Sequence, residues 1–383
     1  MNIYWITQID QKTLHKTSRI ELANALRNKG YNIKLIIQKN VGEHPSDENT
    51  IYLPTFSYSI ISRFMFNILI LVYLPFLMTR KKIDVILIDG GNVYPPFVLL
   101  LKILGYPLIM DLRTLPTGEM KTIQSIFFDS SMYLSKFIVN GYTAITPELK
   151  KILVKKFGID DSKIGVWTSG VSLKSFKKSM TTSTETNIQR DAQYFYLMNH
   201  GKYSRSRGME DLINAIAQID DSIKNKIKLI VVGIDCDRNN ELNKLVEKLN
   251  LSHNLIFIPA VEHEKIPSYI AMCDVGVIPL PTQNIWWRVS SPLKTLEYLG
   301  MGKPIIATDI PFHREIFEKG ECGVLIQNSE PATIANAIVY LFNHKEKLVV
   351  MGRKGREIIE QYYTWEKSAQ DLEDFIKKII MQA

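Results

Sequence analysis

The sequence predicts an α/β protein made of two Rossmann-like domains, and three observations support this fold class. The chain has 383 residues, a length that usually holds two or more domains. Apolar runs typical of buried strands alternate with helical patterns, as in parallel sheets covered by helices. A polar, Ser/Thr-rich segment at residues 172–191 separates two such series. We therefore expect domains over residues 1–180 and 190–365 that face a central cleft, and a last helix over residues 366–383.

The N-terminal series places two polar side chains at a strand end. Ser18 and Glu21 have the spacing of a capping box, and Gly30 is placed to end the helix that they begin. Asp111 and Arg113 follow an apolar run, so they belong at the carboxyl edge of the sheet, where ligands of parallel sheets bind. The expected strands are residues 2–6, 31–37, 84–88 and 107–110, with a helix over residues 96–104.

The C-terminal series begins with a basic loop after its first strand. The loop reads NHGKYSRSRG over residues 199–208 and leads into a helix over residues 209–219. Its cations, Lys202 and Arg207, can neutralise a diphosphate leaving group. The expected strands are residues 194–198, 227–232, 255–259, 275–279 and 305–307.

The most informative stretch is residues 290–308, SSPLKTLEYLGMGKPIIAT. Ser291 is expected to cap a helix that has Pro292 at its first position, and Gly302 is expected to end it. The unpaired amides at the helix start form an anion site, and Glu297 lies about one and a half turns on, near the face of Leu293 and Lys294. One helix thus offers amides to a phosphate and a carboxylate to a ribose diol.

These motifs resemble those of retaining glycosyltransferases with the GT-B fold, of the family 4 type (glycosyl transferases group 1). The resemblance covers nearly the whole chain and is strongest over about residues 195–320. It implies a metal-independent hexosyltransferase that moves a sugar from a nucleotide-sugar co-substrate to a saccharide acceptor, with no cofactor. It also implies that the final helix, opened by residues 363–365, crosses back to the N-terminal domain.

The resemblance and the residue patterns above together give each candidate residue a role. Lys202 and Arg207 stand at the family's Arg and Lys positions, and backbone groups near Ala260 meet the base. The catalytic candidates are Lys202, Arg207 and Asp111; the donor-binding candidates are Glu297, Ser291, Leu293, Lys294, Gly201, Ala260 and Val261; the acceptor-binding candidates are Arg113 and His15.

Two departures from the family pattern leave an alternative open. The family has a second carboxylate eight residues before Glu297, where this chain has Val289. The family's glycine-rich loop after the first strand is replaced by residues 7–17, which contain no glycine. A catalytically inactive GT-B partner subunit is therefore the alternative to an active transferase.

Charge and hydropathy suggest where the acceptor is met. The net charge is +8, but residues 1–180 carry +10 and residues 181–383 carry −2. A basic half favours an anionic membrane surface, and the apolar residues 60–78 form either a core helix or a helix that dips into a membrane; the uninterrupted run is too short to cross one. We expect a cytoplasmic, peripheral membrane protein without a signal peptide, acting on a lipid-linked saccharide in polysaccharide, cell-surface glycan or glycoprotein assembly.

Other functional classes find little support. Asp235 and Asp237 spell a metal-binding Asp-x-Asp pattern, but a helix cap or solvated loop is expected there, and no histidine pair has ligand spacing on one helix, so no metal is expected. His15 is the only histidine that we single out. The three cysteines show no metal spacing and are expected to be reduced thiols. The basic half lacks a nucleic-acid recognition module, so nucleic acid is not an expected partner.

Overall fold

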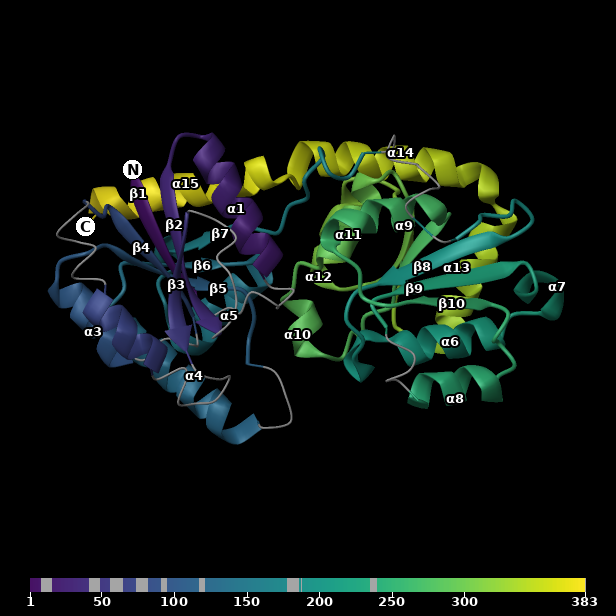
Figure 1. Ribbon diagram of the computed structural model, residues 1–383, viewed down its shortest axis with the longest axis horizontal. Helices are drawn as coiled ribbons and strands as arrows, with labels where there is room; N and C mark the ends of the chain where they lie inside the picture. The colour runs from purple at the N-terminus through teal and green to yellow at the C-terminus, as the bar shows by residue number, and fades with distance from the viewer. Residues whose placement is uncertain are drawn as a thin grey trace. The chain divides into compact units, whose positions relative to one another are not determined.

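The computed structural model describes residues 1–7, 16–40, 49–55, 65–73, 82–90, 95–116, 121–177, 186, 188–234 and 240–382. The chain divides into two compact units: residues 1–170 together with 365–383, and residues 171–364. Each unit is built on a parallel sheet with helices beside it (Figure 1). The fold class expected from the alternating patterns is confirmed, because both units are parallel-sheet α/β domains.

The described strands of the first unit form a seven-stranded sheet in the order β3-β2-β1-β4-β5-β6-β7, with every pair parallel. Every residue of β4 and β5 is buried, as expected for strands that are covered on both faces. The strands are β1 (Asn2–Thr7), β2 (Asn32–Asn40), β3 (Thr50–Thr55), β4 (Val85–Asp89), β5 (Leu108–Leu112), β6 (Gly141–Ala144) and β7 (Ile164–Val166). The helices are α1 (Lys16–Asn28), α3 (Pro95–Ile103), α4 (Lys121–Ser135), α5 (Pro147–Phe157) and α15 (Trp365–Gln382).

The described strands of the second unit form a six-stranded parallel sheet in the order β10-β9-β8-β11-β12-β13. The strands are β8 (Phe195–His200), β9 (Ile227–Val232), β10 (Leu255–Ile258), β11 (Val275–Ile278), β12 (Ile305–Thr308) and β13 (Gly323–Ile326). The helices are α6 (Met209–Ala217), α7 (Asp221–Lys224), α8 (Asn240–Lys248), α9 (Ile266–Met272), α10 (Ile285–Arg288), α11 (Leu293–Gly300), α12 (Pro311–Glu318), α13 (Pro331–Asn343) and α14 (Lys345–Tyr362).

The second unit has a hydrophobic core on each face of its sheet. Along β8, Tyr196 and Met198 join one buried cluster, whereas Phe195 and Leu197 join the other. This alternation follows from the period of two in a strand. Packing on both faces holds β8 in place and so positions the start of the loop that follows His200.

The C-terminal helix α15 belongs to the first unit, where it packs against α1 and β7. Two glycines of the sheet leave room for side chains of α15. A β-carbon on Gly165 of β7 would overlap the Phe375 ring, and one on Gly141 of β6 would lie 2.8 Å from Ile379. Tyr31 also donates a hydrogen bond of 2.6 Å to Glu373 of this helix.

One local expectation about the first unit needs correction. Helix α1 begins at Lys16, so Ser18 lies inside the helix and is not its N-cap. Within the apolar segment 60–78, the structure describes a helix over residues 65–73 that buries Phe66 and Ile70 and exposes Ile68 and Val72. Across the described parts of the chain, no helix combines the length and hydropathy that crossing a bilayer requires.

Candidate functional site

Glu297 is the centre of a buried polar cluster in the second unit. It lies in α11 with 5% of its surface exposed, and its two carboxylate oxygens are bonded by two different histidines. His200 Nε2 lies 2.7 Å from Oε2, and His263 Nε2 lies 2.7 Å from Oε1. Burial acts to raise the pKa of this carboxyl, but the hydrogen bonds and charges of His200 and His263 outweigh it and lower the pKa to about 2. Glu297 is therefore a carboxylate at neutral pH.

His200 is held from its other side by a tyrosine. It ends β8, and its Nδ1 lies 2.8 Å from the hydroxyl of Tyr298, which is fully buried. Burial lowers the pKa of His200, although Glu297 opposes this. The ring donates Nε2–H to the carboxylate, and the Tyr298 hydroxyl on its other side donates to Met198 O at 3.0 Å.

Two cationic side chains converge on Gly201. A β-carbon on this glycine would lie 3.8 Å from Lys294 Nζ and 3.9 Å from Arg207 Nη1, and its φ of +110° favours glycine. Lys294 is 9% exposed, and its Nζ lies 3.4 Å from Asn199 Oδ1. Burial and then the charge of Arg207 lower the pKa of Lys294 to about 7, against the pull of Glu297. Two crowded cations with few anionic partners form a site that favours an anion.

Arg207 is fixed by a tryptophan of α10. Its guanidinium carbon lies 5.4 Å from the centroid of the Trp287 ring, and Trp287 Nε1 donates a 2.7 Å hydrogen bond to Ser206 O. Trp286 stacks on Trp287 with ring centroids 5.3 Å apart. Burial lowers the pKa of Arg207. The aromatic pair thus orients the arginine that lies next to Gly201.

The two cations that the sequence paired differ in exposure. Lys202 is exposed and has no polar contact in the part of the chain that the structure describes, whereas Arg207 is half-buried. Lys294 of α11 also lies near Arg207, since both approach Gly201.

The start of α11 also differs from expectation. The helix begins at Leu293 with Pro292 in the N-cap position, so the N-cap residue is not Ser291, which is buried. The helix ends at Gly300, and Gly302 follows in the left-handed conformation with its N–H bonded to Leu299 O, as expected.

The remaining donor-side candidates lie after β10. Ala260 is exposed, and Val261 packs against the core two residues before His263. His263 also lies 5.7 Å from the ring of Phe176. The bond from His263 to Glu297 therefore links the proposed base-binding loop to the proposed ribose-binding carboxylate.

The first unit carries its own buried polar cluster at the carboxyl ends of its strands. Asp111 of β5 is 2% exposed, and its Oδ1 accepts hydrogen bonds from Thr143 (2.7 Å) and from Trp167 Nε1 (3.0 Å). Its Oδ2 is buried without a hydrogen-bond partner among the described residues. Burial raises the pKa of Asp111, while Arg113 and Arg19 act to lower it. An orphaned buried carboxylate oxygen of this kind indicates a place for a ligand donor.

Arg113 lies beside Asp111 and has an orphaned atom of its own. Its guanidinium carbon is 3.6 Å from the centroid of the Trp167 ring, and its Nη2 donates to Ser169 Oγ at 3.3 Å. Its Nη1 is buried and finds no partner in the described chain. Burial lowers the pKa of Arg113 to about 9, although Asp111 raises it. Asp89, which ends the neighbouring strand β4, is satisfied by an ion pair of 2.9 Å with Arg19.

Three candidates cannot be placed. His15, Asp235 and Asp237 lie outside the described residues. Within the described ranges, no group of three or more His, Cys, Asp or Glu side chains has a geometry that could hold a metal ion.

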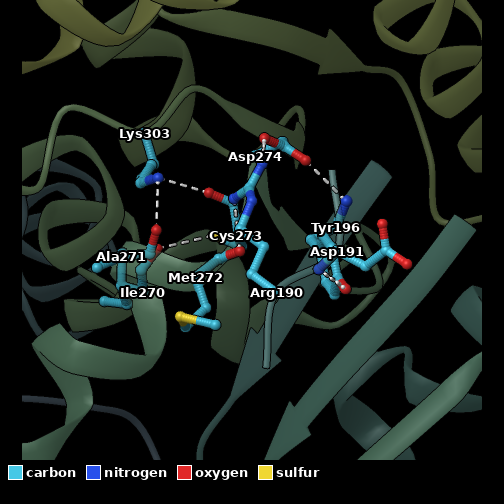
Figure 2. Close-up of polar contacts among 9 residues, drawn as sticks. All are labelled: Arg190, Asp191, Tyr196, Ile270, Ala271, Met272, Cys273, Asp274 and Lys303. Carbon is cyan, nitrogen blue, oxygen red and sulfur yellow. Dashed lines mark hydrogen bonds and ion pairs between the residues drawn. The ribbon is translucent and has the colours of Figure 1, made fainter. Parts of the chain in front are cut away.

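The lysine of the Gly-Lys-Pro sequence has a structural contact. Lys303 Nζ donates to the carbonyl oxygens of Ala271 (2.9 Å) and Cys273 (2.6 Å) at the end of α9, as Figure 2 shows. In the same cluster Arg190 pairs with Asp274, whose other oxygen accepts from Tyr196 N at 2.8 Å. This lysine therefore closes a helix end, where cations are favourable.

Comparison with known proteins decides the family. The family described as "Glycosyl transferases group 1" matches residues 183–358, and "Glycosyltransferase Family 4" matches residues 17–175. The chain belongs to the GT-B glycosyltransferases of the family 4 type. The expected family is thus confirmed.

Curated relatives of this glycosyltransferase are distant. It is 24% identical over 269 residues to an uncharacterized glycosyltransferase of Methanocaldococcus jannaschii, a match that covers 69% of this chain and 65% of that one. It is 27% identical over 221 residues to a D-inositol 3-phosphate glycosyltransferase of Pseudarthrobacter chlorophenolicus, covering 57% and 50%. The chain thus spans about half to two thirds of the length of these relatives.

Solved structures share the fold over the whole glycosyltransferase chain. Sucrose-phosphate synthase from Thermosynechococcus elongatus has a TM-score of 0.79 at 16% identity, with 100% of both chains covered. HepE of Anabaena in complex with UDP and glucose has a TM-score of 0.74 at 16% identity, with 99% of this chain and 100% of that chain covered.

Proposed function

We propose that this glycosyltransferase moves a sugar, with retention of configuration, from a nucleotide-sugar donor to a saccharide acceptor. The observation that carries the proposal is the ionised Glu297, one turn after Lys294 in α11, with Arg207 and Lys294 meeting at Gly201. A carboxylate suits a ribose diol, and clustered cations suit a diphosphate. The related HepE of Anabaena has been solved with UDP-glucose, which supports a donor of this class.

The donor half of the reaction follows from these groups. Glu297 accepts the ribose hydroxyls, the first amides of α11 at Leu293 and Lys294 face the diphosphate, and backbone groups at Ala260 and Val261 contact the base. When the bond from the sugar C1 to the diphosphate oxygen breaks, charge grows on the diphosphate. Arg207 and Lys294 stabilise that charge, which is the principal catalytic contribution of this unit.

The acceptor is proposed to bind at the polar cluster of the first unit. Asp111 Oδ2 can accept a hydroxyl proton and Arg113 Nη1 can donate to a hydroxyl oxygen, so the two orphaned atoms match one alcohol-rich ligand. The acceptor oxygen attacks C1 on the face that the leaving group departs from, and its proton passes to the departing phosphate oxygen. This sequence needs neither a covalent enzyme intermediate nor a cofactor. His15 remains a candidate acceptor contact.

The test is nucleotide binding followed by turnover. We expect one member of a nucleotide-sugar panel to raise the melting temperature and to be consumed when a saccharide acceptor is added. Glu297→Ala should weaken its binding in calorimetry by about 1.5–3 kcal/mol, the size of charge-assisted hydrogen bonds. Unchanged affinity in a folded variant would remove Glu297 from the donor site.

Metal independence is a separate prediction. Because cations of the protein and helix amides are proposed to neutralise the diphosphate, turnover should be the same after treatment with EDTA. Loss of turnover that Mg²⁺ or Mn²⁺ restores would contradict this and would return attention to Asp235 and Asp237.

A second candidate function is a non-catalytic partner subunit. One observation favours it: Val289, at the position of the family's first carboxylate, is 1% exposed and apolar. This second function would be supported if the protein binds a nucleotide sugar but transfers its sugar to none of a range of acceptors.

The acceptor is further proposed to be lipid-linked, as in cell-surface glycan assembly, and presented at the inner face of the plasma membrane. Exposed apolar side chains occur on α3, on α4 and just after α4. The two helices are neighbours in the first unit (Figure 1). The exposed side chains include Leu99, Ile103, Ile126, Phe127, Leu134 and Phe137, the last 84% exposed. Because the first 180 residues carry +10, the matching partner is an anionic membrane surface.

Vesicle co-sedimentation tests this membrane contact. We expect binding to vesicles of phosphatidylcholine with phosphatidylglycerol at low salt, and release at high salt, since each basic residue near such a surface contributes about 1 kcal/mol that salt screens. Phe127→Ser and Phe137→Ser should reduce binding, whereas Val349→Ser, an exposed apolar site of the second unit, should not. If the protein does not bind these vesicles at low salt, the membrane contact is refuted, but the proposed transferase activity is not.

A further inference from the structure

The histidines bonded to Glu297 have no role in the reaction as described above, and their arrangement suggests one. They come from separate elements: His200 ends β8, and His263 opens the 3-10 turn His263–Lys265. Each bonds a different oxygen of one carboxylate at 2.7 Å. Two donors on opposite oxygens fix both the position and the plane of the carboxylate.

His200 provides the rigid side of this arrangement. Its Nδ1 contacts the Tyr298 hydroxyl at 2.8 Å, and that hydroxyl lies 3.0 Å from Met198 O. The Tyr298 ring is itself packed on Gly276, where a β-carbon would lie 2.5 Å from the ring. Backbone and packing therefore fix the direction of the His200 Nε2–H bond.

His263 provides the accessible side. Its side chain is 40% exposed, against 6% for the side chain of Glu297, and it follows Val261 by two residues. The charged or titratable groups that face Glu297 are His200 from β8, His263 from the 3-10 turn, and Lys294 and Tyr298 from α11 itself. Of the two histidines, His263 is the one that a ligand could approach from solvent.

We propose that His200 and His263 are positioning residues that keep Glu297 ionised and aimed, so that each of its oxygens keeps a lone pair for one hydroxyl of a vicinal diol. A carboxylate has about four lone-pair sites, and the histidines take two of them. The two remaining lone pairs, one on each oxygen, can accept hydrogen bonds from the two hydroxyls of a diol. A single hydroxyl would use only one of them. The nucleotide part of this inference rests on the proposed function; the ionisation of Glu297 does not.

The first test measures the ligand-free protein. A glutamate whose folded pKa lies below its unfolded value contributes stability that is full above the unfolded pKa and is lost as pH falls toward the folded pKa. The melting temperature of His263→Ala should therefore be below that of the wild type at pH 5.5, and the difference should shrink as pH falls to 3. His263→Gln, which keeps an N–H donor, should restore most of the loss at pH 5.5. His253→Ala, at an exposed histidine of the same unit, should show no such pH dependence.

The second test measures binding of UDP, GDP and ADP by calorimetry at pH 7. For whichever binds the wild type most tightly, we expect about tenfold weaker binding in His263→Ala, the scale of one charge-assisted hydrogen bond, and near wild-type binding in His263→Gln. His200→Gln, which also keeps a donor, should bind better than His200→Ala.

The two tests fail separately. A difference in melting temperature between wild type and His263→Ala that is constant from pH 5.5 to 3 would show a packing role and overturn the inference. Binding that His263→Ala leaves unchanged would also overturn it. If none of the three nucleotides binds the wild type, the proposed function and the diol role fall together, while the stability profile still decides whether the histidines hold Glu297 ionised.

Discussion

Replacing Arg207 with alanine is expected to lower turnover by about 100-fold or more, the scale of losing one preorganised group that stabilises transition-state charge. Arg207 is half-buried, lies against Trp287 and reaches Gly201 beside Lys294. Because charge on the diphosphate grows as the sugar leaves, the loss should appear mainly in kcat and less in the affinity for the donor. Steady-state kinetics with the donor found by the nucleotide-sugar screen would measure it.

Lys202 and Arg205 provide matched controls in the same loop. Lys202 is exposed and makes no polar contact in the described ranges, and Arg205 forms an exposed ion pair of 2.6 Å with Glu241. Alanine at either position should change kcat by a few fold at most, as exposed charges contribute little. If Lys202→Ala lowered kcat as much as Arg207→Ala does, the diphosphate site would not be formed by Arg207 and Lys294 as proposed.

The order of strands and helices could be predicted because buried parallel strands appear as continuous apolar runs. Four strands escaped this pattern: β3 contains a proline, Pro54, and β6, β7 and β13 have only three or four residues, each with a glycine. Glycine weakens the sequence signal of a strand. Two of these glycines have a reason that local sequence cannot contain, since Gly141 and Gly165 make room for side chains of α15, more than 200 residues later.

Within the candidate site, the sequence identified the helix with Glu297 but not its partners. His200 and His263 lie 97 and 34 residues away from Glu297 along the chain, so no local spacing joins them. The available signal was positional: each follows a predicted strand, and strand ends of a parallel sheet share one edge. Ser291 was misjudged for a different reason, because a Ser-Pro pair allows the proline either at the first helical position or, as here, at the N-cap.

Lys294 is expected to reduce the stability of the free protein while it strengthens donor binding. Its folded pKa of about 7 lies well below that of an unfolded lysine, about 10.4. Between these values the unfolded chain binds a proton that the folded chain does not, so stability falls as pH decreases toward 7 and the full cost is present below it. Lys294→Met should therefore raise the unfolding free energy at pH 7 by about 1–4 kcal/mol, the range seen when apolar side chains replace buried charges.

The same lysine should make donor affinity depend on pH. A bound diphosphate favours the charged ammonium, so affinity for the nucleotide sugar should be constant below pH 7 and should fall above it, by at most about tenfold per pH unit. The nucleotide sugar is the better probe because its diphosphate diester does not titrate between pH 6 and 9. In Lys294→Arg the charge persists and the decline should disappear, while Lys294→Met should bind weakly at every pH despite its higher stability. Both effects follow from one buried ammonium that the donor diphosphate neutralises. The role of Lys294 would therefore be excluded if the wild-type affinity for the nucleotide sugar were constant from pH 6 to 9. It would also be excluded if Lys294→Met unfolded more easily than the wild type.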